Sequence, residues 1–284
     1  MKNILKLVGL FVLMGFSFFY TDKVVEVIRE EDNIMIEIQS VKDLYKIDAM
    51  SANVVDNTII PGVEGRVVNV DKSYKEMKSI GKFNKNSLVY DVVRPSVSIV
   101  NNKDKFIVKG NSLKQMVSLV FVINDDKYLN KINKISIDKD VIFNYFIDYE
   151  FLIDNTTLVK EMKNGEFYSY GNKGKYTPDN LLFSNNLISR IRNEEAIYCL
   201  NIDMDESGLD LCNSNGLYTI SPSFVRGDNA YNVITKNLES GSIILIDITT
   251  DNINNLGVII DYIKGKGLKI RGLSELINEE VISD

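Results

Sequence analysis

Histidine is entirely absent from the 284 residues of this sequence. Histidine is the commonest metal ligand in proteins and the usual proton carrier near neutral pH. Its absence therefore excludes zinc sites with imidazole ligands, Ser-His triads and Cys-His dyads. Tryptophan is also absent, and the chain has only two cysteines.

Basic residues are also fewer than acidic ones. The formal net charge is -6 and the pI is near 5.0, and no local basic cluster forms a phosphate-binding stripe. These features argue against nucleic acid as a partner. With 45% hydrophobic and 25% charged residues, the chain is globular and long enough for one large domain plus a smaller one.

Residues 4–20 form the longest apolar stretch, ILKLVGLFVLMGFSFFY, which is interrupted only by Lys6 and Ser17. This length is at the lower limit for a helix that crosses a bilayer. Lys2 and Lys6 favour a cytoplasmic amino terminus, and no cleavage signature follows. We expect a signal anchor over residues 1–21, a single-pass transmembrane helix that places the rest of the chain outside the cytoplasm. A cleaved signal peptide is the alternative, and a buried first helix is a weaker one.

The two cysteines, Cys199 and Cys212, fit an exported protein. Disulfides persist in oxidising compartments, and closing a loop of this length contributes about 3 kcal/mol. We expect a disulfide between them, and two free buried thiols are the alternative.

Residues 22–110 read as a small α+β module with no catalytic pattern. The predicted strands are 34–38, 66–70, 88–92, 97–100 and 106–108, and Ser73 is the predicted cap of a helix. The residues Lys109, Gly110 and Asn111 are the expected junction with the next domain, 111–284.

Strands and helices alternate beyond Gly110. Val117–Ile123 is a β-branched apolar run typical of a strand buried on both faces, and further strands are predicted at 141–147 and 242–248. Helical spacing lies between and after these strands, and Leu256–Ile263, which follows the last of them, is one such helix. Alternation of this kind predicts an α/β fold with a parallel sheet or barrel and helices outside.

Four segments of this region resemble the polysaccharide deacetylase family, also called the NodB-homology domain. They are SLVFVIND, VIFNYFIDYEFLIDNTTLVKEMKNGE, GSIILIDI and VIIDYIKGKGLKIRGLSELI, and the similarity covers roughly residues 112–280. The resemblance implies a distorted or incomplete (β/α) barrel. It also implies removal of acetyl groups from chitin-like sugars or peptidoglycan.

The family's chemistry uses a divalent ion held by an Asp and two His, a second Asp as base and another His as acid. The paired acids align with Val122 and Ile123, the two metal-binding histidines with Gly171 and Lys175, and the acid histidine with Asp247. None of these five residues is of the type that the family has at the aligned position. The resemblance therefore implies a pseudoenzyme without a cofactor, whose degenerate pocket holds these five residues.

Asp125, Asp126 and Asp247 offer an alternative, a hard-cation site built from oxygen ligands. The competing interpretation is that Asp125 and Asp126 are the first acids of a helix and complement its dipole. Asp247 interrupts a buried run, so it needs a partner, and Lys175 is the candidate.

Tyr168, Tyr170 and Tyr176 crowd the turn that faces the family's groove, and sugar rings stack on such side chains. Ordinary packing of a Tyr-rich sequence is the alternative. Three functions remain open. The first is a membrane-anchored pseudo-deacetylase that binds cell-wall glycan or scaffolds an envelope complex. The others are an active N-deacetylase with an unconventional site and a structural module that binds an envelope protein.

Overall fold

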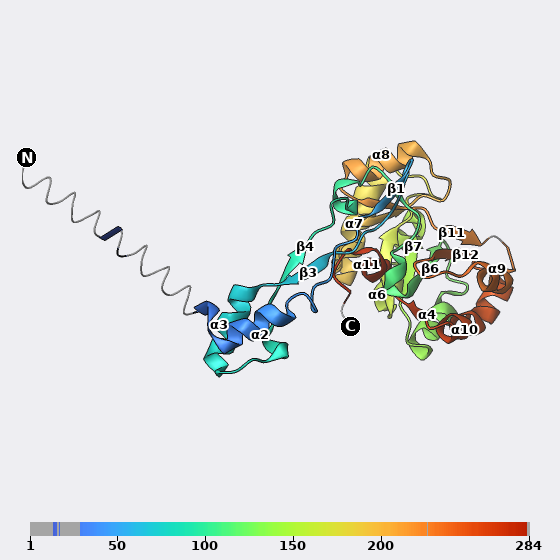
Figure 1. Cartoon of the computed structure of the whole chain (residues 1–284). Helices are drawn as coiled ribbons and strands as arrows, with labels where there is room; N and C mark the ends of the chain where they lie inside the picture. Colours follow the sequence, from blue (N-terminus) through green and yellow to red (C-terminus); the bar gives the residue numbers. More distant parts are fainter. Residues whose placement is uncertain (1–13, 16, 18–28, 226, 283–284) are drawn as a thin grey trace, which may run out of the picture. The chain divides into compact units, whose positions relative to one another are not determined.

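The computed structural model describes residues 14, 15, 17, 29–225 and 227–282. The chain forms two compact units, traced in Figure 1. One comprises Met1–Ala49 and Gly65–Arg94, and the other comprises Met50–Glu64 and Pro95–Asp284. The expected junction near Gly110 differs from this division, because residues 50–64 and 95–110 are part of the larger unit.

The smaller unit pairs two helices with a two-stranded antiparallel sheet. Its elements are α2 (Asn33–Val41), β3 (Gly65–Val68), α3 (Val70–Ile80), η1 (Lys85–Ser87) and β4 (Tyr90–Val93). Helices α2 and α3 lie side by side (Figure 1) and bury Ile38 and Met77 between them. Gly81 ends α3 in the left-handed conformation, where a residue without a Cβ is favoured.

Two strand predictions near these elements were wrong. The run 34–38 lies in α2, because Ile34 and Ile38 recur at helical spacing and share its buried face. Residues 97–100 contain no strand and lead into η2 (Ile99–Asn101). Ser73 lies inside α3, and the helix is capped instead by Asn69, whose side chain accepts the N–H of Lys72 at 2.9 Å.

Two sheets organise the larger unit, and almost all of their strands are parallel. The first has the order β11-β12-β6-β7-β8, and β13 also pairs with β6. These strands are β6 (Met116–Ile123), β7 (Phe143–Ile147), β8 (Gly165–Ser169), β11 (Ser223–Val225), β12 (Ile243–Ile246) and β13 (Lys269–Ile270). The second sheet has the order β1-β2-β5-β10-β9, with β1 (Asn53–Val55), β2 (Thr58–Ile60), β5 (Phe106–Ile107), β9 (Tyr198–Leu200) and β10 (Tyr218–Ile220).

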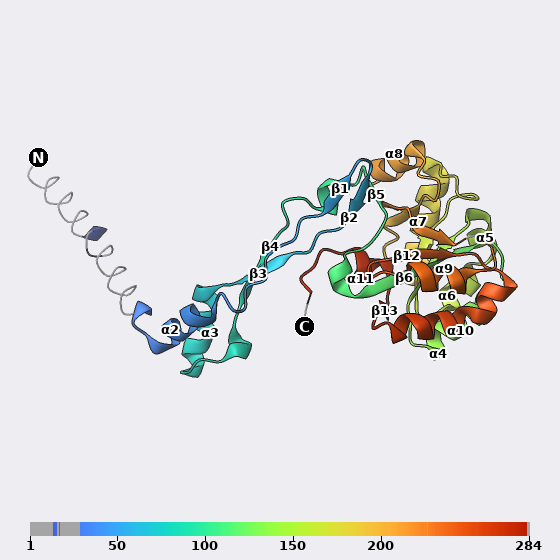
Figure 2. The ribbon, with the colours of Figure 1, turned by 45° about the vertical axis from the view of Figure 1, so that its right-hand side comes forward.

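Helices follow most of the parallel strands and cover the sheets from outside (Figure 2). They are α4 (Leu129–Asp138), α5 (Tyr149–Asp154), α6 (Thr156–Glu161), α7 (Pro178–Arg192), α8 (Glu206–Ser214), α9 (Ala230–Asn237), α10 (Thr250–Gly265) and α11 (Leu273–Ile277), with the short turn η3 (Ser112–Lys114) before β6. Strands β8 and β9 are not hydrogen-bonded neighbours, so the parallel strands are divided between the two sheets. This is an incomplete (β/α) barrel.

The predicted anchor over residues 1–21 lies outside the described residues, apart from Met14, Gly15 and Ser17. Among the residues that the structure describes, no helix has the length and apolar character needed to cross a membrane. The structure joins Cys199 on β9 to Cys212 on α8 by a disulfide, and both side chains are buried.

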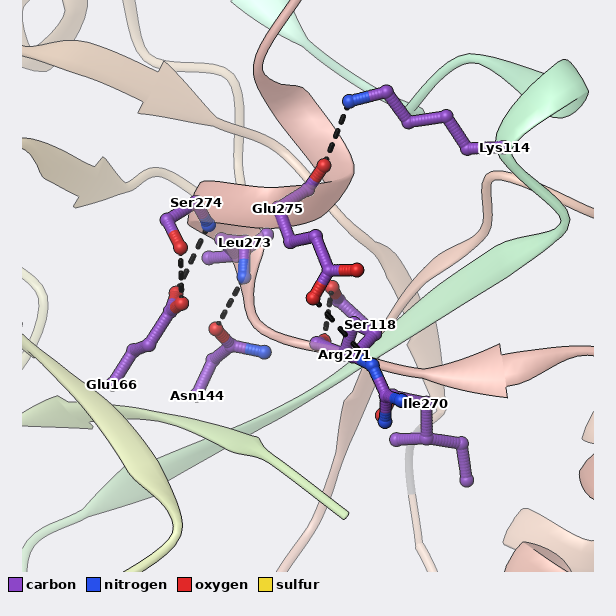
Figure 3. A network of polar contacts seen from close by, with 9 residues as sticks. All are labelled: Lys114, Ser118, Asn144, Glu166, Ile270, Arg271, Leu273, Ser274 and Glu275. Carbon is purple, nitrogen blue, oxygen red and sulfur yellow. Dashed lines mark hydrogen bonds and ion pairs between the residues drawn. The ribbon is translucent and has the colours of Figure 1, made fainter. Parts of the chain in front are cut away.

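Helix α11 is fixed against the sheet by side chains of two strands (Figure 3). Asn144 of β7 accepts the N–H of Leu273 at 2.7 Å. It also donates to the carbonyl of Leu119 on β6 at 3.1 Å. Glu166 of β8 accepts the N–H of Ser274 at 3.0 Å and the hydroxyl of the same residue. These bonds satisfy N–H groups at the amino end of the helix, where no intrahelical acceptor exists.

The fully buried Asn144 is therefore expected to be a stability determinant. Asn144→Ala leaves the buried N–H of Leu273 without its acceptor, which costs roughly 1–3 kcal/mol in the free energy of unfolding. Denaturant unfolding checks this value. The exposed Asn255→Ala is the matched control and should change stability by less than about 0.5 kcal/mol. Equal effects of the two substitutions would contradict the anchoring role.

Lys114 holds the opposite end of α11. Its Nζ donates to the carbonyl of Glu275 at 2.7 Å and to two oxygens of Asn278, the backbone carbonyl and the side-chain amide oxygen (Figure 3 shows the bond to Glu275). The side chain is buried, and this burial lowers the pKa of Lys114 from 10.5 to about 8.

Stability should therefore depend on pH through Lys114. Between about pH 8 and 10.5 the unfolded chain binds one proton more than the folded chain at this residue, so the free energy of unfolding rises with pH. The stability gained over this range is lost again as the pH falls from 10.5 to about 8, and below that pH the charged lysine destabilises the fold to its full extent. The difference between the wild-type protein and Lys114→Met, measured by denaturant unfolding, should grow in favour of the wild type over this range. A difference independent of pH would contradict the assignment.

Candidate functional site

A cleft opens where the carboxyl ends of the parallel strands meet in the larger unit. It consists of two adjoining hollows of about 760 and 480 Å³, which share Tyr170, Lys173, Ile202 and Asp247 as lining residues. Tyr170 follows β8, Ile202 follows β9 and Asp247 follows β12. In α/β barrels the chemistry lies at this end of the strands, because loops of several strands converge there.

The five predicted pocket positions are divided by the structure. Val122 and Asp247 line the smaller hollow, and Lys175 and Asp247 line the larger one. Ile123 lines neither, because its side chain is buried in the core. Its carbonyl accepts the N–H of Asp148. Gly171 lines neither hollow but lies directly beside the backbone of Lys175. Four of the five therefore gather at the cleft or beside it.

The segment 171–175 is a tight turn and not the helical turn on which the family places two histidines. The N–H of Asn172 donates to the carbonyl of Lys175 at 2.9 Å, and the N–H of Lys175 donates back to Asn172 at 2.9 Å. Gly171 has a φ of +66°, and a Cβ there would lie 2.5 Å from the carbonyl oxygen of Lys175. This backbone leaves no room for a side chain at position 171.

Asp247 finds its partner in the backbone. Its Oδ2 accepts the N–H of Gly227 at 2.8 Å, and the buried Asn252 donates to the carbonyls of Gly227 and Asp247 at 2.8 and 3.0 Å. The predicted pairing with Lys175 is not formed: within the described residues Lys175 makes no ion pair and its side chain is exposed. The reason is that Asp247 is only half-buried, so it does not require a charged partner.

One of the three tyrosines predicted to bind sugar is packed inside. Tyr168 is 3% exposed, donates to Glu166 at 2.6 Å and packs its ring against Phe146 and Tyr198, with ring centroids 5.1 Å apart in each case. It cannot stack on a sugar, so this prediction was wrong for Tyr168. Its orientation follows from the alternation of side chains along β8.

Tyr176 contributes mainly structure as well, although it lines the larger hollow. Its hydroxyl accepts the N–H of Leu200 at 2.9 Å and lies 3.0 Å from the carbonyl of Ser169, so it ties β8 to β9 where the two strands do not pair. Burial raises the pKa of Tyr176, which keeps this hydroxyl protonated. Tyr170 and Tyr176 are both half-buried, and Tyr170 is the one of the three that borders both hollows.

Asp125 and Asp126 do not complete a cation site. Asp125 lines the smaller hollow, where its side chain accepts the N–H of Lys127 at 3.0 Å, whereas Asp126 lines neither hollow. In the described part of the chain no three His, Cys, Asp or Glu side chains form a group that can hold a metal ion. The alternative site formed by Asp125, Asp126 and Asp247 is therefore not present.

Sequence reasoning missed Asp148, which follows β7 directly. It is 4% exposed, and its carboxylate accepts the N–H of Glu150 at 3.0 Å and the N–H of Lys173 at 2.6 Å. It thereby caps α5 and holds the 171–175 turn against the sheet. The acid that ends the strand VIFNYFI was the available signal. Asp203 and Asp205 also line the larger hollow, from the loop after β9.

Fold and cleft together define the class of this protein: it has the fold of the polysaccharide deacetylases, carbohydrate esterase family 4, and its described residues hold no metal-binding group. The resemblance seen in the sequence is confirmed at this level. No family model matches the chain.

Individual similar proteins come from Bacillus. Wild-type BA3943 of Bacillus anthracis, a CE4 family pseudoenzyme, shares 23% identity with a TM-score of 0.67 over 89% of this chain and 97% of its own. A BA3943 mutant with restored enzymatic activity gives the same TM-score, at 22% identity over 88% of this chain and 100% of its own. PdaA of Bacillus subtilis, a family 4 carbohydrate esterase, gives 0.54 at 19% identity over 63% of this chain and 86% of its own. The uncharacterized protein YlxY of Bacillus subtilis is 28% identical over 247 residues, which are 78% of this chain and 75% of YlxY.

The turn at Gly171 should not tolerate a side chain. Gly171→Ala forces a Cβ into a left-handed backbone and against the Lys175 carbonyl, so we expect a loss of roughly 1–3 kcal/mol in the free energy of unfolding. Gly265→Ala, at an open helical position, is the control and should be neutral or stabilising. Thermal and denaturant unfolding measure both. A neutral Gly171→Ala would show that the turn is not constrained in this way.

For the same reason, new ligands should not rebuild the metal site. A variant with Val122→Asp, Gly171→His and Lys175→His is expected to retain no stoichiometric zinc after dialysis, measured by elemental analysis on protein whose circular dichroism shows a folded chain. One zinc ion per folded chain would refute the structural argument.

Proposed function

We propose that this chain is a membrane-anchored, extracytoplasmic member of the polysaccharide-deacetylase-like proteins that has no catalytic activity and binds cell-wall glycan in its cleft. One observation carries the proposal. The cleft persists at the carboxyl ends of the strands, while the positions of the metal ligands are taken by an aliphatic side chain, a constrained glycine and an exposed lysine.

The lining of the cleft supports a carbohydrate ligand. Tyr170 presents a half-exposed ring with both hollows beside it, and Asn201 and Ser207 contribute amide and hydroxyl groups to the larger hollow. Sugars offer apolar C–H faces and many hydroxyls, and recognition sites combine aromatic side chains with a few fixed polar groups. The hollow of about 760 Å³ is large enough for a short oligosaccharide.

The location outside the cytoplasm rests on the apolar residues 4–20 and the lysines before them. The disulfide between Cys199 and Cys212 supports it, since such bonds are rare in reducing compartments. A protein held at the outer face of the membrane is in contact with cell-wall glycan, which is therefore the polymer available for binding.

Retention on insoluble peptidoglycan tests the proposal. Full-length protein should sediment with purified peptidoglycan, and Tyr170→Ala should weaken this retention at least about tenfold, a loss of about 1.4 kcal/mol. Tyr231→Ala is the matched control, because Tyr231 is exposed on α9 and outside the cleft. Absence of retention, or equal loss in both variants, would refute glycan binding in the cleft and favour a protein partner.

Acetate release separates the proposal from its enzymatic alternative. An active N-deacetylase with an unconventional site must free acetate from N-acetylated glycan. We expect none above a sample without protein, with or without added zinc. Acetate release that Asp247→Ala abolishes would establish an enzyme instead.

A further inference from the structure

We infer that the cleft recognises a positively charged sugar, the de-N-acetylated amino-sugar unit of a glycan. This inference rests on the glycan-binding function proposed above and names the sugar that the cleft prefers. It depends on the charge of the cavity walls, on the way each charged group is held, and on the position of the aromatic ring beside them.

Acids outnumber bases among the lining residues. Five aspartates and two lysines line the joined hollows, which gives a formal charge of -3. The aspartates are Asp125, Asp148, Asp203, Asp205 and Asp247, and the lysines are Lys173 and Lys175. A concave surface lined by an excess of one charge concentrates ligands of the opposite charge.

Among the described residues, no ion pair offsets this negative charge. Backbone N–H groups are the partners that hold Asp148 and Asp247, and they leave the formal charge of each carboxylate unchanged. Both lysines have exposed side chains that make no ion pair with any described residue. In the metal-dependent deacetylases a divalent ion contributes two positive charges at this place, and the described residues here form no group that can hold one. A ligand that neutralises the carboxylates of the cleft must therefore carry the positive charge itself.

The ring of Tyr170 offers a surface on which a sugar can stack, and it lines the same hollows as the aspartates. Burial raises the pKa of Tyr170, and the negative charges of Asp203 and Asp148 raise it further. The hydroxyl therefore remains protonated. Because Tyr170 and Asp203 line the same hollow, a sugar ring that stacks on Tyr170 places its substituents in the space that Asp203 borders.

An ammonium group suits this position better than an acetamide group. It carries three donors and no acceptor, and its bonds to carboxylates are charge-assisted. An acetamide offers a single uncharged N–H donor, and it brings a methyl group and an acceptor oxygen toward carboxylates that can only accept. The cleft should therefore favour the amine over its N-acetylated form.

Titration calorimetry with sugars of equal length tests this preference. Full-length protein should bind a tetramer of glucosamine at least about tenfold more tightly than a tetramer of N-acetylglucosamine, a difference of about 1.4 kcal/mol. The preference should shrink as the salt concentration rises, because ions screen charges at exposed sites.

A double variant, Asp203→Asn with Asp247→Asn, should abolish the preference while it retains acceptor oxygens and shape. Asp138→Asn with Asp154→Asn is the control, because it removes the same charge from two exposed positions outside the cleft. The control should keep the preference of the wild type. Equal loss in both double variants would overturn the assignment to the cleft.

The outcomes distinguish the two proposals. Binding of both tetramers with equal affinity, or tighter binding of the acetylated one, overturns the charged-sugar inference and leaves glycan binding intact. Binding of neither refutes the proposed function itself. A tetramer of lysine that binds as tightly as the glucosamine tetramer would show a surface for any cation and would overturn recognition of a sugar.

Discussion

The larger unit depends on one strand. Strand β6 pairs with β12, β7 and β13, and most of its side chains are buried, so burial of apolar surface on both faces fixes its register. Its amino-terminal half is held by Ser118, which donates to the carbonyl of Arg271 at 2.8 Å, and its carboxyl end delivers Val122 to the cleft. The cleft exists because the neighbouring strands end beside this one.

The departure from the metal-dependent deacetylases lies in the backbone as well as in the side chains. Val122 lies on the regular strand β6, where a different side chain has room, whereas Gly171 belongs to a turn that has no space for a Cβ. Asp148, which follows β7, holds that turn by accepting the N–H of Lys173. One similar structure is a BA3943 mutant with restored enzymatic activity. In the present chain the turn would have to be rebuilt first.

Strands β6 and β12 of the central sheet could be predicted from the sequence because they lie in apolar, β-branched runs that are buried on both faces. Val117–Ile123 and 242–248 are such runs, and the strand β5 was also found. The run 34–38 failed, because a short apolar segment fits a helix as well as a strand until its neighbours are known. The region 177–231 has only weak apolar periodicity in the sequence, although it contains α7, β9, α8, β10 and β11. Its strands are only three residues long, too short to carry a pattern.

The site was harder to predict, since alignment places residues on a chain but not in space. Histidine could be excluded from composition alone, and the positions of Val122, Lys175 and Asp247 at the cleft followed from the resemblance. The burial of Tyr168 did not, because it depends on the rings of Phe146 and Tyr198 from other strands. Asp148 was missed since a single acid after a strand has many structural uses.

The central claim is that a cleft of this fold binds glycan without a metal ion. The most direct test measures the affinity of the full-length protein for a peptidoglycan fragment in the presence of a chelator and again with added zinc. The account predicts the same dissociation constant in both conditions. An affinity that disappears with the chelator and returns with zinc would contradict it.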